Sequence, residues 1–108
     1  MADSRLILTE LKKSLQIVLG DQIQEVILFG SYSKNQESIY SDLDLLIVTK
    51  NICDWKEKNL IREVCYDYSV DYDVLIDSKI ISQKEIDKEY WGKHPLIIDV
   101  LKTGVYAE

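Results

Sequence analysis

The feature that most constrains this chain is a Gly-Ser pair followed, ten residues later, by an Asp-x-Asp motif. Gly30 and Ser31 come directly after the apolar run 26–29, so we expect a buried strand that ends in a tight turn. At such a turn a glycine lets backbone N–H groups approach phosphate oxygens, and the serine hydroxyl adds a further donor. This half of the motif predicts a phosphate-binding turn.

The second half of the motif predicts a metal site. Asp42 and Asp44 open the apolar run 45–48, and alternation along a strand points both carboxylates to the same side. Two carboxylates on one face suit a hard divalent cation such as Mg²⁺, which keeps several waters and shares the phosphates of the substrate. A phosphate-binding turn beside a metal site predicts chemistry on a nucleoside triphosphate.

Two-metal phosphoryl chemistry requires a further carboxylate from a neighbouring strand. We expect a third strand over residues 70–76, in which Asp71 and Asp73 share one face by the same alternation. Asp73 directly precedes an apolar run, as Asp44 does, and is the preferred third ligand. Asp71 is the alternative, or a group that orients the site.

The remaining signals predict an α/β (α+β) fold in which a small mixed sheet is flanked by helices, as a single domain over residues 1–108. Strands are expected over 26–29, 42–49 and 70–76. Helices are expected over 4–19 before Gly20, after the capping box Asp54-x-x-Glu57, from Ser82-x-x-Glu85 to about Trp91, and from Pro95 to Gly104.

Charge and composition exclude several classes of function. With 13 Lys and Arg against 19 Asp and Glu the formal net charge is −6, which argues against a dedicated nucleic-acid binder and suits a basic protein partner. No apolar run approaches the length of a membrane span, and no export signal is visible at the start. Cys53 and Cys65 lack metal-binding spacing, which indicates free thiols and a cytoplasmic location.

Together, the Gly-Ser pair, the Asp-x-Asp motif and a later aspartate on an apolar strand resemble the polymerase-β-type nucleotidyltransferase superfamily. More closely, the chain is similar to the minimal nucleotidyltransferases (the MNT group), which include antitoxins paired with HEPN-type toxins. The segment 94–106 is also similar to the usual ending of that group.

The resemblance implies an enzyme that uses two Mg²⁺ ions to transfer a nucleoside monophosphate, most simply AMP from ATP, to an acceptor hydroxyl. It implies that Asp42 and Asp44 bind both ions and that Asp73 holds the catalytic one. It also implies that Ser31 and the backbone at Gly30 hold the β- and γ-phosphates.

One segment departs from the group. Where its members often carry Ala-Arg-Gly, this chain reads Ser33-Lys34-Asn35. Lys34 keeps the positive charge of the arginine as a phosphate contact but loses its bidentate fork, which predicts weaker binding of the triphosphate.

Three functions remain open from the sequence. In the first, the chain is a protein adenylyltransferase that modifies and silences a HEPN-type toxin. In the second, it is an antitoxin that acts by binding alone, with no catalysis. In the third, it is a transferase for a small acceptor whose pocket is completed by a homodimer.

Overall fold

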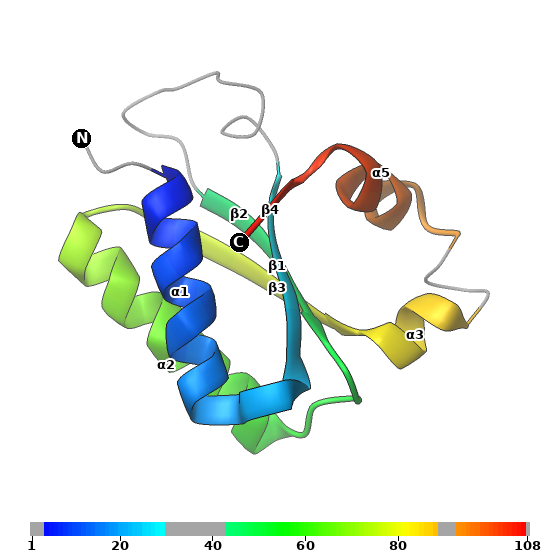
Figure 1. Cartoon of the computed structure of the whole chain (residues 1–108), viewed down its shortest axis with the longest axis horizontal. Coiled ribbons are helices and arrows are strands. Elements are labelled where there is room, and N and C mark those ends of the chain that lie inside the picture. The colour runs from blue at the N-terminus through cyan, green and yellow to red at the C-terminus, as the bar shows by residue number, and fades with distance from the viewer. Residues whose placement is uncertain (1–3, 30–42, 89–92, 108) are drawn as a thin grey trace.

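A four-stranded mixed sheet lies at the centre of the computed structural model, which describes residues 4–29, 43–88 and 93–107 (Figure 1). The elements follow in the order α1 (Ser4–Leu19), the 3-10 turn η1 (Gly20–Gln22), β1 (Ile23–Phe29), β2 (Leu43–Thr49), α2 (Trp55–Tyr72), β3 (Ile76–Ser82), α3 (Gln83–Asp87), α5 (Pro95–Thr103) and β4 (Val105–Tyr106). The α/β fold class expected from the sequence is confirmed.

The strand order is β3-β2-β1-β4. β1 is antiparallel to both of its neighbours, whereas β2 and β3 are parallel. A parallel pair needs a long crossover connection, and α2 provides it here. As a result, β2 and β3 both begin at the end of the sheet where β1 finishes.

Helices α1 and α2 cover one face of the sheet (Figure 1). Between them and the strands lies the larger core, to which Leu43, Leu45 and Ile47 of β2 contribute. From α2, Ile61 and Cys65 are buried in this core. Tyr72 adds a hydrogen bond between the helices, because its hydroxyl donates to Glu10 of α1 at 2.6 Å.

The opposite face of the sheet is covered by α5, with α3 beside it (Figure 1). Here Leu46 and Val48 of β2 pack with Ile81 of β3 and with Ile97 and Val100 of α5. Successive residues of β2 thus enter different cores, as the pleat of a strand requires.

Both predicted capping boxes are confirmed. Asp54 accepts a hydrogen bond from the backbone of Glu57 at 2.8 Å, and the Glu57 carboxylate accepts one in return at 3.3 Å. Ser82 and Glu85 form the same arrangement at the start of α3. Pro95 lies in the first turn of α5, as predicted, and Gly104 ends that helix.

The strand expected over residues 70–76 is wrong. The helix α2 continues to Tyr72, Asp73 ends it in a left-handed conformation with φ 53°, and the strand runs over Ile76–Ser82. The reason is tertiary packing: Ile61, Cys65 and Tyr72 recur at helical spacing and all pack into the core beneath α1. This packing overrides the strand-like alternation of residues 70–73.

One further expectation is revised at the C-terminal end, and one short strand is added to the predicted set. The helix expected to reach about Trp91 ends at Asp87, although Trp91 itself lies outside the described residues. Strand β4 is not predicted from the sequence, because only two residues form it.

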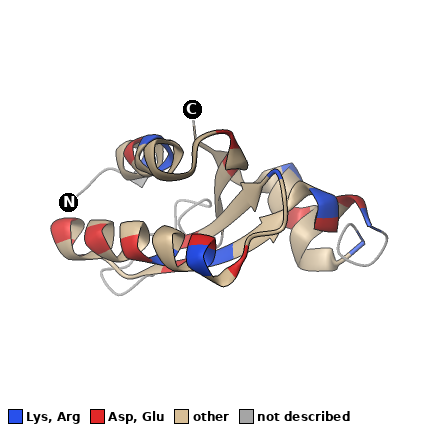
Figure 2. Ribbon diagram, turned by 90° about the horizontal axis from the view of Figure 1, so that it is seen from below, with Lys and Arg blue, Asp and Glu red and all other residues tan. Residues whose placement is uncertain are grey.

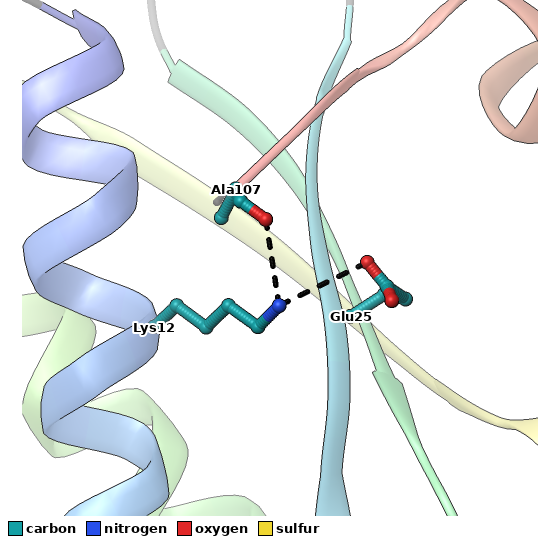
Figure 3. Close-up of polar contacts among 3 residues, drawn as sticks. All are labelled: Lys12, Glu25 and Ala107. Atoms are coloured by element: carbon teal, nitrogen blue, oxygen red, sulfur yellow. Dashed lines mark hydrogen bonds and ion pairs between the residues drawn. The ribbon is translucent and has the colours of Figure 1, made fainter.

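Polar contacts fix the chain directly after β4 (Figure 3). Lys12 of α1 donates to the carbonyl oxygen of Ala107 at 3.4 Å and forms an ion pair with Glu25 of β1 at 4.0 Å.

Across the three described segments, the structure contains no helix that is both long enough and apolar enough to cross a bilayer.

The turn between α5 and β4 requires a glycine. A Cβ at Gly104 would collide with the Ile27 side chain and would lie 2.6 Å from the carbonyl oxygen of Val100. Ile27 is fully buried and the carbonyl is backbone, so neither can move away cheaply. We expect Gly104→Ala to lower the free energy of unfolding by about 2–3 kcal/mol, measured by urea denaturation.

Gly20 offers the matched control. It adopts φ +58°, and no atom lies within 4 Å of the point that a Cβ would occupy, so the constraint there is conformational only. Since asparagine tolerates the left-handed region, Gly20→Asn should cost less than about 1 kcal/mol. Equal losses for the two variants would contradict the steric explanation.

Candidate active site

The predicted site residues divide into those the structure describes and those it does not. Gly30, Ser31, Lys34 and Asp42 lie in 30–42, outside the described residues. Their flanks are described: Phe29 ends β1, and Asp44 is the second residue of β2. Phe29 and Asp44 are register partners, so the chain enters and leaves the Gly-Ser/Asp-x-Asp segment at one end of the sheet.

Asp44 has a carboxylate neighbour that the sequence analysis did not identify. In the parallel pairing of β2 with β3, Asp44 is in register with Asp77. Neighbouring strands lie about 4.8 Å apart, and residues in register on parallel strands point to the same face. The two carboxylates therefore stand side by side.

The face on which they stand follows from the two cores. Leu43 and Leu45 enter the core under α1 and α2, so Asp44 points to the opposite face with Leu46. On β3, Ile81 packs under α5, which places Asp77 and Lys79 on that same face by alternation.

This half of the face is open. The side chain of Asp77 retains 57% of its accessible surface and that of Lys79 49%, whereas Ile81, further along β3, is buried. Lys79 Nζ lies 3.9 Å from the Asp77 carboxylate. An exposed pair of this kind adds little stability, and both groups are accessible to a ligand.

Asp71 and Asp73 lie at the end of helix α2 and not on a strand. Asp71 is exposed in the last turn of α2, and Asp73 is exposed at the helix C-cap, three residues before β3 begins. Strand alternation therefore does not apply to either residue. Their assignment as third ligand stays a prediction that the structure does not test, but it loses the geometric argument on which it was based.

A signal for Asp77 was present in the sequence. The capping box at Ser82 marks the start of a helix there, and the helical spacing of Ile61, Cys65 and Tyr72 carries α2 past residue 70. The two signals together leave only the segment between them for the strand. Asp77 then falls near the start of that strand, as Asp44 does in β2.

The carboxylates of Asp44 and Asp77 are the kind of ligand that a magnesium ion prefers. Mg²⁺ binds carboxylate oxygens and keeps several waters, which an open sheet face allows. Within 4–29, 43–88 and 93–107 no cluster of three or more His, Cys, Asp or Glu side chains is placed to bind a metal. The described part of the chain therefore supplies a pair, Asp44 and Asp77, and Asp42 lies next to it in sequence.

The position of Cys65 keeps its thiol away from this site. Cys65 is buried in the core under α1 and α2, on the face opposite the carboxylates. Burial raises the pKa of its thiol to about 11, and a hydrogen bond with Ser78 offsets part of the rise. Since the thiolate is the nucleophile, this thiol is inert near neutral pH.

The sequence of this chain matches a known family of domains. Residues 6–105 match the family model described as "Nucleotidyltransferase domain". The chain belongs to the nucleotidyltransferase domain family. The pair of carboxylates, Asp44 and Asp77, therefore belongs to a nucleotidyltransferase domain.

Two relatives come from Methanocaldococcus jannaschii. "Putative protein adenylyltransferase MJ0141" is 40% identical over 84 residues, which cover 78% of this chain and 84% of the relative. "Putative protein adenylyltransferase MJ1305" is 30% identical over 105 residues, which cover 91% of this chain and 66% of the relative.

Solved structures show the same fold. A crystal structure of a toxin–antitoxin with AMP-PNP superposes with a TM-score of 0.58 at 17% identity, over 91% of this chain and 70% of that one. A mutant of the toxin–antitoxin MntA-HpeT gives a TM-score of 0.55 at 16% identity, over 87% of this chain and 67% of that one. This nucleotidyltransferase domain therefore shares its fold with chains of those assemblies.

The thiol chemistry provides a direct check on the core beneath this site. Below the raised pKa of about 11, Cys65 stays protonated and buried, so we expect no alkylation by iodoacetamide in the native protein at a pH near the ordinary value of 9.0. Unfolding in concentrated urea should expose it to complete labelling, counted by mass spectrometry. Labelling of native Cys65 as fast as in urea would contradict the described packing.

Proposed function

We propose that this nucleotidyltransferase depends on Mg²⁺ and transfers AMP from ATP to a hydroxyl of a partner protein, with residues 1–108 forming one domain. The observation that carries the proposal is the register of Asp44 with Asp77, at the end of the sheet where β1 leads into Gly30 and Ser31. The choice of acceptor is supported by the relatives, which are named as protein adenylyltransferases.

The residues take two roles in this proposal. One group holds two Mg²⁺ ions through carboxylate oxygens: Asp42, Asp44 and Asp77. The other group holds the β- and γ-phosphates through N–H donors, a hydroxyl and an ammonium: Gly30, Ser31 and Lys34. When bound, the metal neutralises negative charge on the phosphates.

The transfer step uses these residues as follows. The acceptor oxygen forms a bond to the α-phosphorus, and the bond from that phosphorus to the bridging oxygen breaks. Pyrophosphate leaves with the electron pair, held by the donors at residues 30 and 31. The proton of the acceptor hydroxyl passes to the carboxylate of Asp77, which borders the open half of the face from which an acceptor can approach.

The proposed partner is a toxin of the HEPN type, which makes this chain an antitoxin acting in the cytoplasm. Chains of toxin–antitoxin assemblies share its fold, and one of those assemblies holds AMP-PNP. The net charge of −6 suits a basic partner surface. Acidic residues recur from the middle of α2 onward, as Glu63, Asp67 and Asp71. Figure 2 shows several acidic positions, in red, along one half of a helix.

A second candidate function is neutralisation of the toxin by binding alone. The observation that favours it is the Ser33-Lys34-Asn35 segment, which lacks an arginine for the triphosphate. The third possibility, a small-acceptor transferase completed by a homodimer, predicts transfer without any protein partner.

Transfer of label from ATP tests the proposed enzyme. Purified protein with Mg²⁺ and ATP labelled at the α-phosphate should label one protein in a lysate of the source cells, and γ-labelled ATP should not. We expect Asp44→Asn and Asp77→Asn each to lower the rate by about 100-fold or more, because each removes a charged group that acts on the transition state.

The alternative third ligands provide matched controls of the same chemistry. Asp71→Asn and Asp73→Asn are exposed changes at the end of α2, and asparagine tolerates the left-handed conformation at residue 73. Both should retain transfer within about twofold. If Asp73→Asn abolished transfer while Asp77→Asn did not, the assignment of Asp77 would be wrong.

Protection of cells separates catalysis from binding. A cell that expresses the toxin should be rescued by the wild-type chain and not by the Asp42→Asn/Asp44→Asn double variant, provided that pull-down shows equal binding of both to the toxin. Rescue at full strength by the double variant would favour neutralisation by binding alone.

A further inference from the structure

A cavity of about 280 Å³ lies on the same face of the sheet as the carboxylate pair. It is bounded by β2 and β3 on one side and by α3 and α5 on the other, and its lining residues are Leu46, Lys79, Ile80, Ile81, Glu85, His94, Leu96 and Ile97. None of the roles assigned above uses this space.

The cavity continues directly from the carboxylates along both strands. Leu46 follows Asp44 by two residues on the same face of β2, and Lys79 follows Asp77 in the same way on β3. At about 3.3 Å per residue, the cavity thus begins about 7 Å from the carboxylates and reaches Ile81 at about 13 Å. A ribose and a base placed end to end span a comparable distance from an α-phosphate.

The walls suit a flat aromatic ring with a few polar atoms. Leu46, Ile81 and Ile97 are buried aliphatic side chains, which give two apolar surfaces. The volume is at the small end for a ligand site, so it matches a base and part of its sugar rather than a whole nucleotide.

Polar groups lie at defined places in this wall. Glu85 comes after the end of β3, so it stands at the far end from Asp77, and both of the hydrogen bonds that its carboxylate accepts from Ser82 use Oε1. That carboxylate can only accept hydrogen bonds when ionised. The His94 ring accepts the backbone N–H of Leu96 at Nδ1, at 3.2 Å.

We propose that this cavity binds the adenine base of the nucleotide, and that Glu85 accepts a hydrogen bond from its exocyclic amine. The inference rests on the proposed function, because it assumes that the α-phosphate is held beside Asp44 and Asp77. The inference also explains how the protein would select adenine over guanine. A carboxylate acceptor at this position favours the amine of adenine and repels the carbonyl oxygen of guanine.

Helix α5 offers a matched pair of variants. Leu96 and Ile98 are aliphatic residues of similar exposure, 37% and 38%, but only Leu96 lines the cavity. Leu96→Trp should fill the cavity and weaken the binding of α,β-methylene-ATP with Mg²⁺ by about tenfold or more, measured by calorimetry. Ile98→Trp should leave that affinity unchanged within about twofold.

Inorganic tripolyphosphate has the phosphates of ATP but no base, so it separates binding of the base from binding of the phosphates. We expect Leu96→Trp to leave the affinity for tripolyphosphate unchanged, whereas Asp44→Asn should weaken the binding of both tripolyphosphate and the nucleotide. Equal losses for both probes in Leu96→Trp, or no loss for the nucleotide, would overturn the inference. So would a higher KM for the acceptor protein with unchanged nucleotide affinity, because the cavity would then hold a side chain of the acceptor.

Glu85→Gln tests how the base is recognised. A glutamine can keep the capping bond through its oxygen and presents an amide donor in place of the second carboxylate oxygen. The ratio of affinities for the α,β-methylene analogues of ATP and GTP should fall by about tenfold, and an unchanged ratio would remove Glu85 from the proposal.

The failures of the two proposals are distinguishable. If Leu96→Trp weakened nucleotide binding but the wild-type protein transferred AMP to no acceptor, the cavity would be upheld and the transferase refuted. Transfer that is normal in Leu96→Trp at limiting ATP would uphold the transferase and refute the cavity.

Discussion

The parallel pairing of β2 with β3 is the constraint on which the site depends. Its register places Asp77 beside Asp44, while Ile76 and Ile80 of β3 pack against the core under α1 and α2. Because side chains alternate along a strand, a slip of one residue would turn Asp77 toward α2 and bring Ile76 or Ser78 to the open face. Packing in one core therefore determines the arrangement of carboxylates on the other side of the sheet.

The two faces of the sheet differ in what covers them. One is closed by α1 and α2, while α5 covers the other only beyond the carboxylates, so that Ile81 is buried and Asp77 and Lys79 are exposed on the same strand. Two exposed charges contribute little to stability, so folding alone does not explain their position. The proposed transfer would require access for a nucleotide and an acceptor at this position, and the cavity next to Lys79 extends the same surface toward α5.

Much of this could be predicted from local signals. The capping residues Asp54 and Ser82 marked the helix starts, and the short apolar runs marked β1 and β2, because caps and periodicity act within a few residues. The third strand could not be placed this way, since residues 70–73 alternate like a strand but pack as the last turn of α2. The choice of Asp73 as third ligand rested on that strand, so it lost its geometric basis when the segment proved to be the end of α2. Whether a segment forms a helix or a strand was decided by contacts with α1 that are distant in sequence.

The position of the metal tests this account most directly. Mn²⁺ can replace Mg²⁺, and it broadens the NMR signals of amides close to it. With α,β-methylene-ATP present and Mn²⁺ far below the protein concentration, the account predicts that the amides of Asp44 and Asp77 broaden first. Broadening centred on Asp71 and Asp73, with the Asp77 amide still sharp, would contradict it.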